Sequence, residues 1–136
     1  MKHRVTLTVT SLSAILLFSF HQADDVVRGM SSGGLENLIG VAILVLWLFG
    51  TLVLADRRSG LVIILLGSLF GAAMPVIHLK GAGVGGAVAR SSGALLFIWT
   101  LLALGVTGTF AAILAVRGLS ALRRGRADRH TTSTAA

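Results

Sequence analysis

The sequence predicts an all-α membrane protein: a four-transmembrane-helix up-down bundle with both termini on the cytoplasmic side. Composition is the first observation, because 54% of the 136 residues are hydrophobic and only 12% are charged. Soluble domains carry about 25% charged residues. The second observation is four continuous apolar segments, each long enough to cross a bilayer core as a helix. Their continuity excludes the alternating pattern of a barrel wall.

Charged residues mark the ends of the four apolar segments. They are Arg4 and Asp24, Glu36 and Asp56, Arg58 and Lys80, and Arg90 and Arg117. We therefore expect spans at about 5–23, 37–55, 60–79 and 92–116, within one transmembrane domain, 1–118. The remaining residues, 119–136, form a basic tail that we expect to be disordered and cytoplasmic.

The first segment has a second interpretation, as a cleaved secretory signal peptide. Lys2, His3 and Arg4 precede an apolar run, as in such signals. The nearest cleavage motif would be His21-Gln22-Ala23, whose first position holds a bulky histidine. A retained first span is therefore favoured, and cleavage stays open as the alternative.

Positive residues predict the orientation, because cytoplasmic loops of membrane proteins are enriched in Lys and Arg. With the N-terminus inside, nine positive residues are cytoplasmic: Lys2, Arg4, Arg57, Arg58, Arg117, Arg123, Arg124, Arg126 and Arg129. Only Arg28, Lys80 and Arg90 are then outside. We expect Arg57, Arg58, Arg117, Arg123, Arg124 and Arg126 to contact lipid headgroups. The expected location is a bacterial inner membrane.

Small residues predict where the helices pack closely. Gly67 and Gly71 form a GxxxG spacing, which lets helix backbones approach each other. Gly105 and Gly108 supply small positions on the fourth span. Packing within the chain is the favoured interpretation, and a homodimer seam is the alternative.

Hydroxyl side chains form a polar stripe along the first span. Thr6, Thr10 and Ser13 continue on one helix face into His21 and Asp24. Because polar side chains avoid lipid, we expect this stripe to face the other helices. It is the one feature that favours a transporter or channel.

A cluster of ionisable residues is predicted at the outer membrane boundary. Its members are His21, Asp24, Asp25, Glu36 and His78. Both aspartates lie one turn from His21, at i+3 and i+4. Imidazoles and carboxylates are ligands for divalent metals. If the inner helix faces converge, His21 and His78 approach each other with a carboxylate or water between them.

Other interpretations of this cluster remain open. Arg28 and Lys80 could neutralise the acids in a salt-bridged helix end, or the group could relay protons. No HExxH motif accompanies it. Haem ligation by His21 and His78 would lack polar groups for the propionates. We predict no cofactor, with a divalent metal as the one possibility.

Other function classes have no support in the sequence. There is no cysteine, which excludes disulfides and thiolate sites. GxSxG, SxxK and HExxH motifs are absent, so we expect no enzyme. The glycines at 81, 83, 85 and 86 follow no strand and predict a flexible loop, without nucleotide binding. The arginines at 123–129 lie beside a membrane, and we expect no nucleic-acid binding.

Three stretches resemble a known group of proteins. FHQADDVVRG, LADRRSG and MPVIH are similar to segments of small uncharacterised four-helix membrane proteins of high-GC bacteria. The resemblance implies the fold and location only. The chain also resembles small multidrug exporters in size, but it lacks the acidic residue of their first span. The favoured function is a structural or accessory subunit; the alternatives are an oligomeric transporter or channel, and a metal- or cofactor-binding protein.

Overall fold

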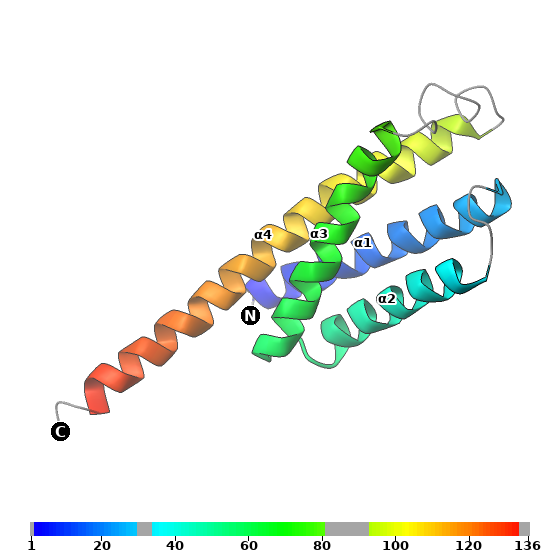
Figure 1. Cartoon of the computed structure of the whole chain (residues 1–136). Helices are drawn as coiled ribbons and strands as arrows, with labels where there is room; N and C mark the ends of the chain where they lie inside the picture. The colour runs from blue at the N-terminus through cyan, green and yellow to red at the C-terminus, as the bar shows by residue number, and fades with distance from the viewer. Residues whose placement is uncertain (1, 30–33, 81–92, 134–136) are drawn as a thin grey trace.

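The computed structural model describes residues 2–29, 34–80 and 93–133, and for Glu36, residues 79–80 and residues 126–133 it describes the backbone alone. The predicted glycine loop at 81–86 lies outside these residues. The described chain is all-α, as predicted. Its four helices are α1 (Lys2–Val27), α2 (Leu35–Leu52), α3 (Arg58–Lys80) and α4 (Ala94–Ser133) (Figure 1).

Three of the helices are long and apolar enough to cross a membrane, judged by length and composition. These segments are Lys2–Val27, Arg58–His78 and Ala94–Gly125. In α2 the apolar part, Asn37–Leu52, is shorter. The predicted second span extends to residue 55, but the helix ends at Leu52. There the chain turns towards α3, and the Arg57 amide donates a hydrogen bond to the Leu54 carbonyl at 2.8 Å.

The predicted disordered tail is corrected by the structure. Helix α4 continues through Leu119 as far as Ser133 and is 40 residues long, which corresponds to about 60 Å. Leu, Ala and Arg dominate residues 119–126, and all three are good helix formers. Leu119 also packs against a buried cluster of Leu7, Leu61, Ile64 and Ala115. High charge alone therefore does not end this helix.

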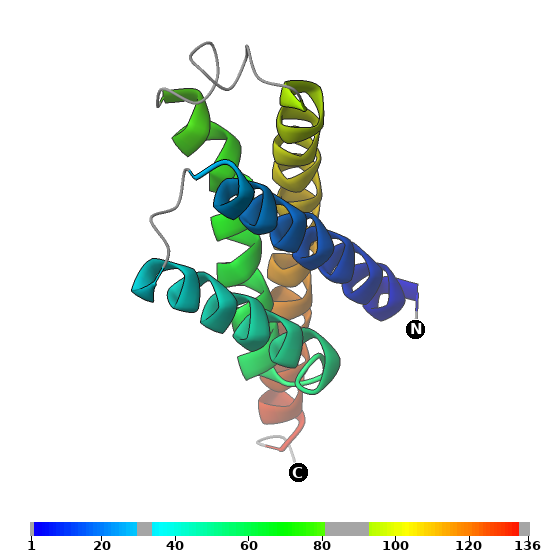
Figure 2. The same cartoon turned by 90° about the vertical axis from the view of Figure 1, so that its right-hand side faces the viewer.

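Helix α4 is the longest element, and α3 packs along it (Figure 1). Helix α1 crosses one face of the α3–α4 pair (Figure 2). Helix α2 lies against α1 and α3. The main core contains Ala14, Ile15, Phe18, Trp47, Met74 and Leu104, contributed by all four helices. Because α1 and α3 end on the same side of the bundle, their C-terminal turns can share a site.

A buried chain of hydrogen bonds joins α1 to α2. The indole N–H of Trp47 donates to Ser11 Oγ at 3.0 Å. The Ser11 hydroxyl lies 2.8 Å from Thr51 Oγ1, and Thr51 donates in turn to the Trp47 carbonyl at 2.9 Å. Each hydroxyl can thus donate one bond and accept another, which satisfies buried groups that would otherwise be costly.

The four glycines predicted for packing all lie at close contacts within the chain. A Cβ on Gly108 would lie 2.8 Å from the Ala72 nitrogen, so α3 and α4 touch backbone to backbone there. Gly67 instead faces the Trp47 indole, with a hypothetical Cβ 2.5 Å from a ring carbon. Gly71 faces Trp47 and Leu104, and Gly105 faces the Pro75 ring. The GxxxG face therefore receives a tryptophan from α2 as well as contacts from α4.

The prediction that the polar stripe of the first span faces the other helices is correct for His21 but wrong for Thr6, Thr10 and Ser13, because the buried face lies about one residue of helix rotation away from these hydroxyls. The buried positions of α1 are Leu7, Ser11, Ala14, Ile15, Phe18 and His21. Thr6, Thr10 and Ser13 are exposed or half-buried and donate to carbonyls of their own helix at 2.8–3.0 Å. Because such local bonds satisfy a hydroxyl without a partner helix, the stripe needs no protein neighbour. It offers no polar path through the bundle.

Candidate metal centre

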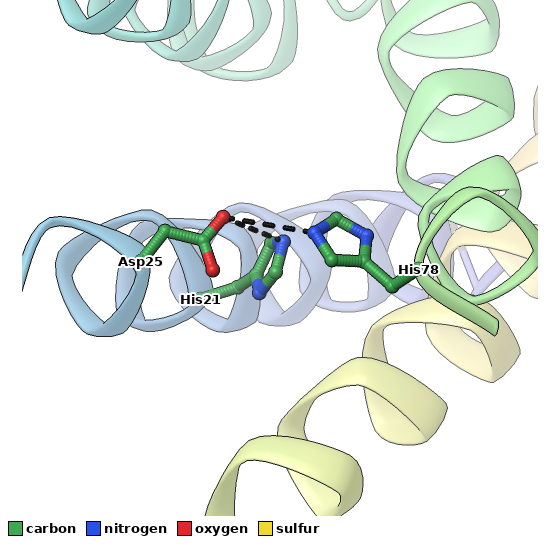
Figure 3. A group of neighbouring side chains, drawn as sticks. All are labelled: His21, Asp25 and His78. Atoms are coloured by element: carbon green, nitrogen blue, oxygen red, sulfur yellow. Dashed lines mark ion pairs between the residues drawn. The ribbon is translucent and has the colours of Figure 1, made fainter. Parts of the chain in front are cut away.

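His21, Asp25 and His78 meet at the C-terminal ends of α1 and α3 (Figure 3). In α1 the inward positions are spaced by three and four residues from Leu7 through Ser11 to His21. One more step of four reaches Asp25, which therefore lies over His21 on the same helix face. His78 comes from the last turns of α3, on the opposite side of the group.

One carboxylate oxygen of Asp25 faces both imidazoles (Figure 3). Asp25 Oδ2 is 3.4 Å from His21 Nε2 and 3.7 Å from His78 Nε2. All three ligand atoms lie within 4.8 Å of one another. Both nitrogen–oxygen distances exceed the 2.7–3.2 Å of ordinary hydrogen bonds by a few tenths of an ångström. The three atoms thus surround a small space that a cation can occupy.

An aromatic side chain from α4 closes one side of this group. The two imidazole centroids are 4.6 Å apart with planes at 81°. The Phe97 ring lies 5.6 Å from His21 and 5.9 Å from His78. His21 is 2% exposed, whereas the side chains of His78 and Asp25 are 16% and 19% exposed. The site is therefore shielded from the side of α4 and has limited access elsewhere.

A backbone carbonyl orients His78. The ring nitrogen Nδ1 lies 3.0 Å from the Met74 carbonyl oxygen, one turn earlier in α3. A carbonyl only accepts hydrogen bonds, so Nδ1 carries the hydrogen and donates it. In the neutral ring, Nε2 then holds a lone pair that faces the Asp25 carboxylate. Two electron-rich atoms that face each other require a proton or a metal ion between them.

Two further atoms of the group are buried without a hydrogen-bond partner among the described residues. They are His21 Nδ1 and Asp25 Oδ1. An unsatisfied buried polar group costs about 1–3 kcal/mol. Such groups are rare in native proteins and are commonly explained by a bound water, an ion or a functional role.

The structure separates the two predicted aspartates. Asp24 does not join the histidines: its Oδ2 accepts from Arg28 Nε at 2.7 Å. The Arg28 guanidinium carbon lies 5.5 Å from the centroid of the Phe97 ring, which holds it beside α4. Asp25, four residues after His21, therefore faces the histidines, whereas Asp24, three residues after His21, pairs with Arg28. The Glu36 side chain lies outside the described residues.

The geometry resembles a set of metal ligands. Zinc binds nitrogen and oxygen at about 2.0–2.2 Å, so ligand atoms of a tetrahedral site are about 3.3 Å apart. The 3.4 Å and 3.7 Å separations are close to that value. The N–H of His78 directed at a backbone carbonyl is the arrangement typical of metal-bound histidine. The same three groups could alternatively share a proton.

Two contributors to the site were absent from the sequence prediction. The Met74 carbonyl lies four residues before His78, so its position could have been inferred from helix geometry. Phe97 lies in the last apolar span among other large apolar residues, and no local pattern distinguishes it. Only the packing of α4 against α1 and α3 identifies this ring as part of the site.

No protein-family model, curated protein or solved structure matches this chain. The resemblance to small four-helix membrane proteins of high-GC bacteria therefore stays a prediction.

Proposed function

We propose that the chain is a four-span accessory protein of a bacterial inner membrane that binds a divalent transition-metal ion, with zinc the best fit. The observation that carries the proposal is the convergence of His21 Nε2, His78 Nε2 and Asp25 Oδ2 around one small space. The ion would connect the outer ends of α1 and α3. We propose no catalytic role for it.

The exposed surface supports the membrane part of the proposal. Many large apolar side chains are exposed along all four helices, such as Val45, Leu66, Leu102 and Phe110. In water such a surface would be an aggregation hazard, whereas in lipid it is the expected exterior. Helix α2 has 18 residues and is about 27 Å long, close to the 30 Å of a bilayer core. It can serve as the fourth span.

Charge supports an N-in, C-in orientation for these four spans. The metal site then lies at the outer boundary, because it is formed by the C-terminal ends of α1 and α3. Arg4 and Asp56 form an exposed ion pair at 2.7 Å near the other end of the bundle. The arginines that follow Ala115 lie at that cytoplasmic end, where anionic headgroups attract them.

Metal binding accounts for the site better than a salt-bridged helix end does. Arg28 already neutralises Asp24, and Asp25 faces the two histidines. A metal ion would supply the positive charge that Asp25 faces and would use the lone pair of His78 Nε2. Zinc, iron and copper all accept imidazole and carboxylate ligands, and zinc needs no redox partner.

Metal analysis tests the proposal directly. The protein, purified without a histidine tag and supplied with zinc, should retain about one metal ion per chain after gel filtration. His21→Ala and His78→Ala should each lose it, because two remaining ligands bind zinc weakly. His3→Ala is the matched control, since His3 is an exposed histidine of the same helix. Equal zinc content in all four proteins would overturn the proposal.

A further inference from the structure

The side chain of Arg28 connects the end of α1 to the start of α4, beside the proposed metal site. Its Nε donates a hydrogen bond to Asp24 Oδ2 at 2.7 Å, one turn earlier in α1. Its guanidinium carbon lies over the Phe97 ring of α4, 5.5 Å from the ring centroid. The two helix ends lie on the same side of the bundle (Figure 1). Arg28 therefore contacts both helices at once.

The turn before α4 leaves space for this guanidinium. Gly93 has a φ of 82°, in the left-handed region that favours glycine. A Cβ at this position would lie 3.0 Å from Arg28 Nη2. The Gly93 carbonyl also accepts a hydrogen bond from the Phe97 amide at 3.1 Å. One glycine turn thus accommodates the arginine and begins the helical turn that carries Phe97.

Phe97 is the residue that contacts both Arg28 and the histidines of the metal site. Its ring centroid lies 5.6 Å from that of His21 and 5.9 Å from that of His78. Phe97 is 1% exposed, and the His21 side chain is 2% exposed. The ring therefore covers the two imidazoles on the side of α4, and its position determines how open that side is.

A cavity beside Phe97 gives the ring room to move. The cavity has a volume of about 380 Å³ and lies between α1 and α4, with Phe97 and Asp24 among its lining residues. A side chain next to such a space can change rotamer more easily than one in a close-packed core. An interaction beyond close packing is therefore needed to keep the ring on the imidazoles.

We propose that Arg28 is a positioning residue of the metal site, which holds the Phe97 ring against the two imidazoles and so slows exchange of the metal ion. The inference rests on the proposed metal function. A guanidinium is attracted to the electron-rich face of an aromatic ring. The charge-assisted hydrogen bond to Asp24 fixes the direction of that guanidinium.

Loss of the Arg28 contact should change the rates of metal exchange more than the affinity. When the ring moves into the cavity, the ligands become accessible from the side of α4. Entry and release of the ion then both become faster, so their ratio changes less than either rate. A cation–π contact of about 0.5–2 kcal/mol corresponds to an increase of about two- to thirtyfold in the fraction of open sites.

Zinc release from the zinc-loaded, full-length protein in nanodiscs tests the inference, with excess pyridylazoresorcinol as the zinc-binding dye. Arg28→Gln should release zinc about two- to thirtyfold faster than wild type, with a smaller change in Kd. Arg28→Lys should lie between the two, because lysine keeps the charge but lacks the planar fork. Arg4→Gln is the matched control, since it breaks the other arginine ion pair of α1, that with Asp56. Equal release rates in Arg28→Gln and wild type would overturn the inference.

A second variant distinguishes this role from a general loosening of the fold. Phe97→Leu removes the aromatic ring and keeps an apolar side chain. If Arg28 acts through the ring, Arg28→Gln should add little to the release rate of Phe97→Leu. The same fold increase in both backgrounds would show that the arginine acts by another route, and the inference would be wrong.

A measurement without metal separates this inference from the metal proposal. Carbethoxylation by diethyl pyrocarbonate, followed by mass spectrometry, reports the accessibility of each histidine in the zinc-free protein. Arg28→Gln should raise the rate at His21, while the exposed His3 reacts equally in both proteins. An unchanged rate at His21 in a protein that binds zinc would overturn this inference alone. A raised rate at His21 in a protein that binds no zinc would overturn the metal proposal and support the hold of Arg28 on Phe97.

Discussion

Asp24 and Asp25 are adjacent in the sequence and have different partners in the structure. Asp25 faces two histidines at 3.4 Å and 3.7 Å, whereas Asp24 accepts from Arg28 at 2.7 Å. A rotation of about 100° between successive residues of a helix separates their directions. The carboxylate that we assign to the metal is therefore one specific residue of the pair.

Replacing each aspartate in turn tests this assignment. Asp25→Asn should weaken zinc binding at least about 10–100-fold, because it removes the only charged ligand while preserving side-chain size. Asp24→Asn should change zinc affinity little, since Asp24 lies outside the ligand group. Zinc titration against a competing fluorescent chelator measures both affinities. A larger loss in Asp24→Asn than in Asp25→Asn would contradict the assignment.

Ser11 is a second residue whose role depends on its burial. Ser11→Ala should lower the free energy of unfolding by about 1–3 kcal/mol, because the Trp47 indole N–H and the Thr51 hydroxyl both lose a buried partner. Ser13→Ala is the matched control, since Ser13 bonds only its own helix at Val9. Thermal unfolding in detergent compares the two variants. Equal melting temperatures would mean that the buried network adds nothing to stability.

At the scale of helices, the interface between α3 and α4 is built on backbone contact. Gly108 approaches Ser68 and Ala72 so closely that no side chain fits between them. Trp47 fills the space left by Gly67, which ties α2 to the same surface of α3. Small residues therefore serve two purposes on α3: a close helix contact and a socket for a large side chain. The faces that carry these glycines are occupied within one chain.

Alanine substitution should have opposite effects at two glycines of α4. Gly108→Ala should destabilise the protein, since its Cβ would lie 2.8 Å from the Ala72 nitrogen and 2.9 Å from the Ser68 carbonyl oxygen. Gly125→Ala should be neutral or stabilising by up to about 1 kcal/mol, because alanine favours helix and its Cβ meets nothing within 4 Å. Melting temperatures in detergent measure both. Stabilisation by Gly108→Ala would contradict the close contact.

At the scale of the whole molecule, the proposed topology places the two ends of the bundle in different environments. The outer end carries the His21–Asp25–His78 group, and the cytoplasmic end carries the positive residues and the extension of α4. The extension is basic, with Arg123 and Arg124 exposed. In the proposed topology this asymmetry would give each end a distinct partner: a metal ion at the outer end and anionic lipid at the cytoplasmic end.

Reporter fusions test the four-span topology. A reporter active only in the cytoplasm should work after Ala136 and within residues 56–59, and one active only outside should work within residues 81–89. The positive-inside rule is the physical reason. An external reading at the C-terminus would require an odd number of spans. Intact-mass measurement then decides whether α1 is retained, since loss of about the first 23 residues would remove Ser11 and His21.

Local physical chemistry explains what could be predicted from the sequence. A long apolar run forms a helix wherever its backbone groups must be satisfied internally, so all four helices follow from hydropathy. The i, i+4 spacing of His21 and Asp25 follows from helix geometry as well. The approach of His21 to His78 follows from placing both at the outer ends of their helices. These inferences need no knowledge of which helix packs on which.

Packing decided the remaining features. The sequence alone selected a face of α1 through Thr6, Thr10 and Ser13, but hydroxyls bonded to their own helix tolerate lipid, and the buried face lies one residue away. Because of that rotation, Asp25 faces the histidines, and Asp24 forms an ion pair with Arg28. Phe97 joined the site because α4 packs across α1 and α3. Helix rotation and helix neighbours depend on contacts between distant residues, and for that reason only the tertiary structure determined them.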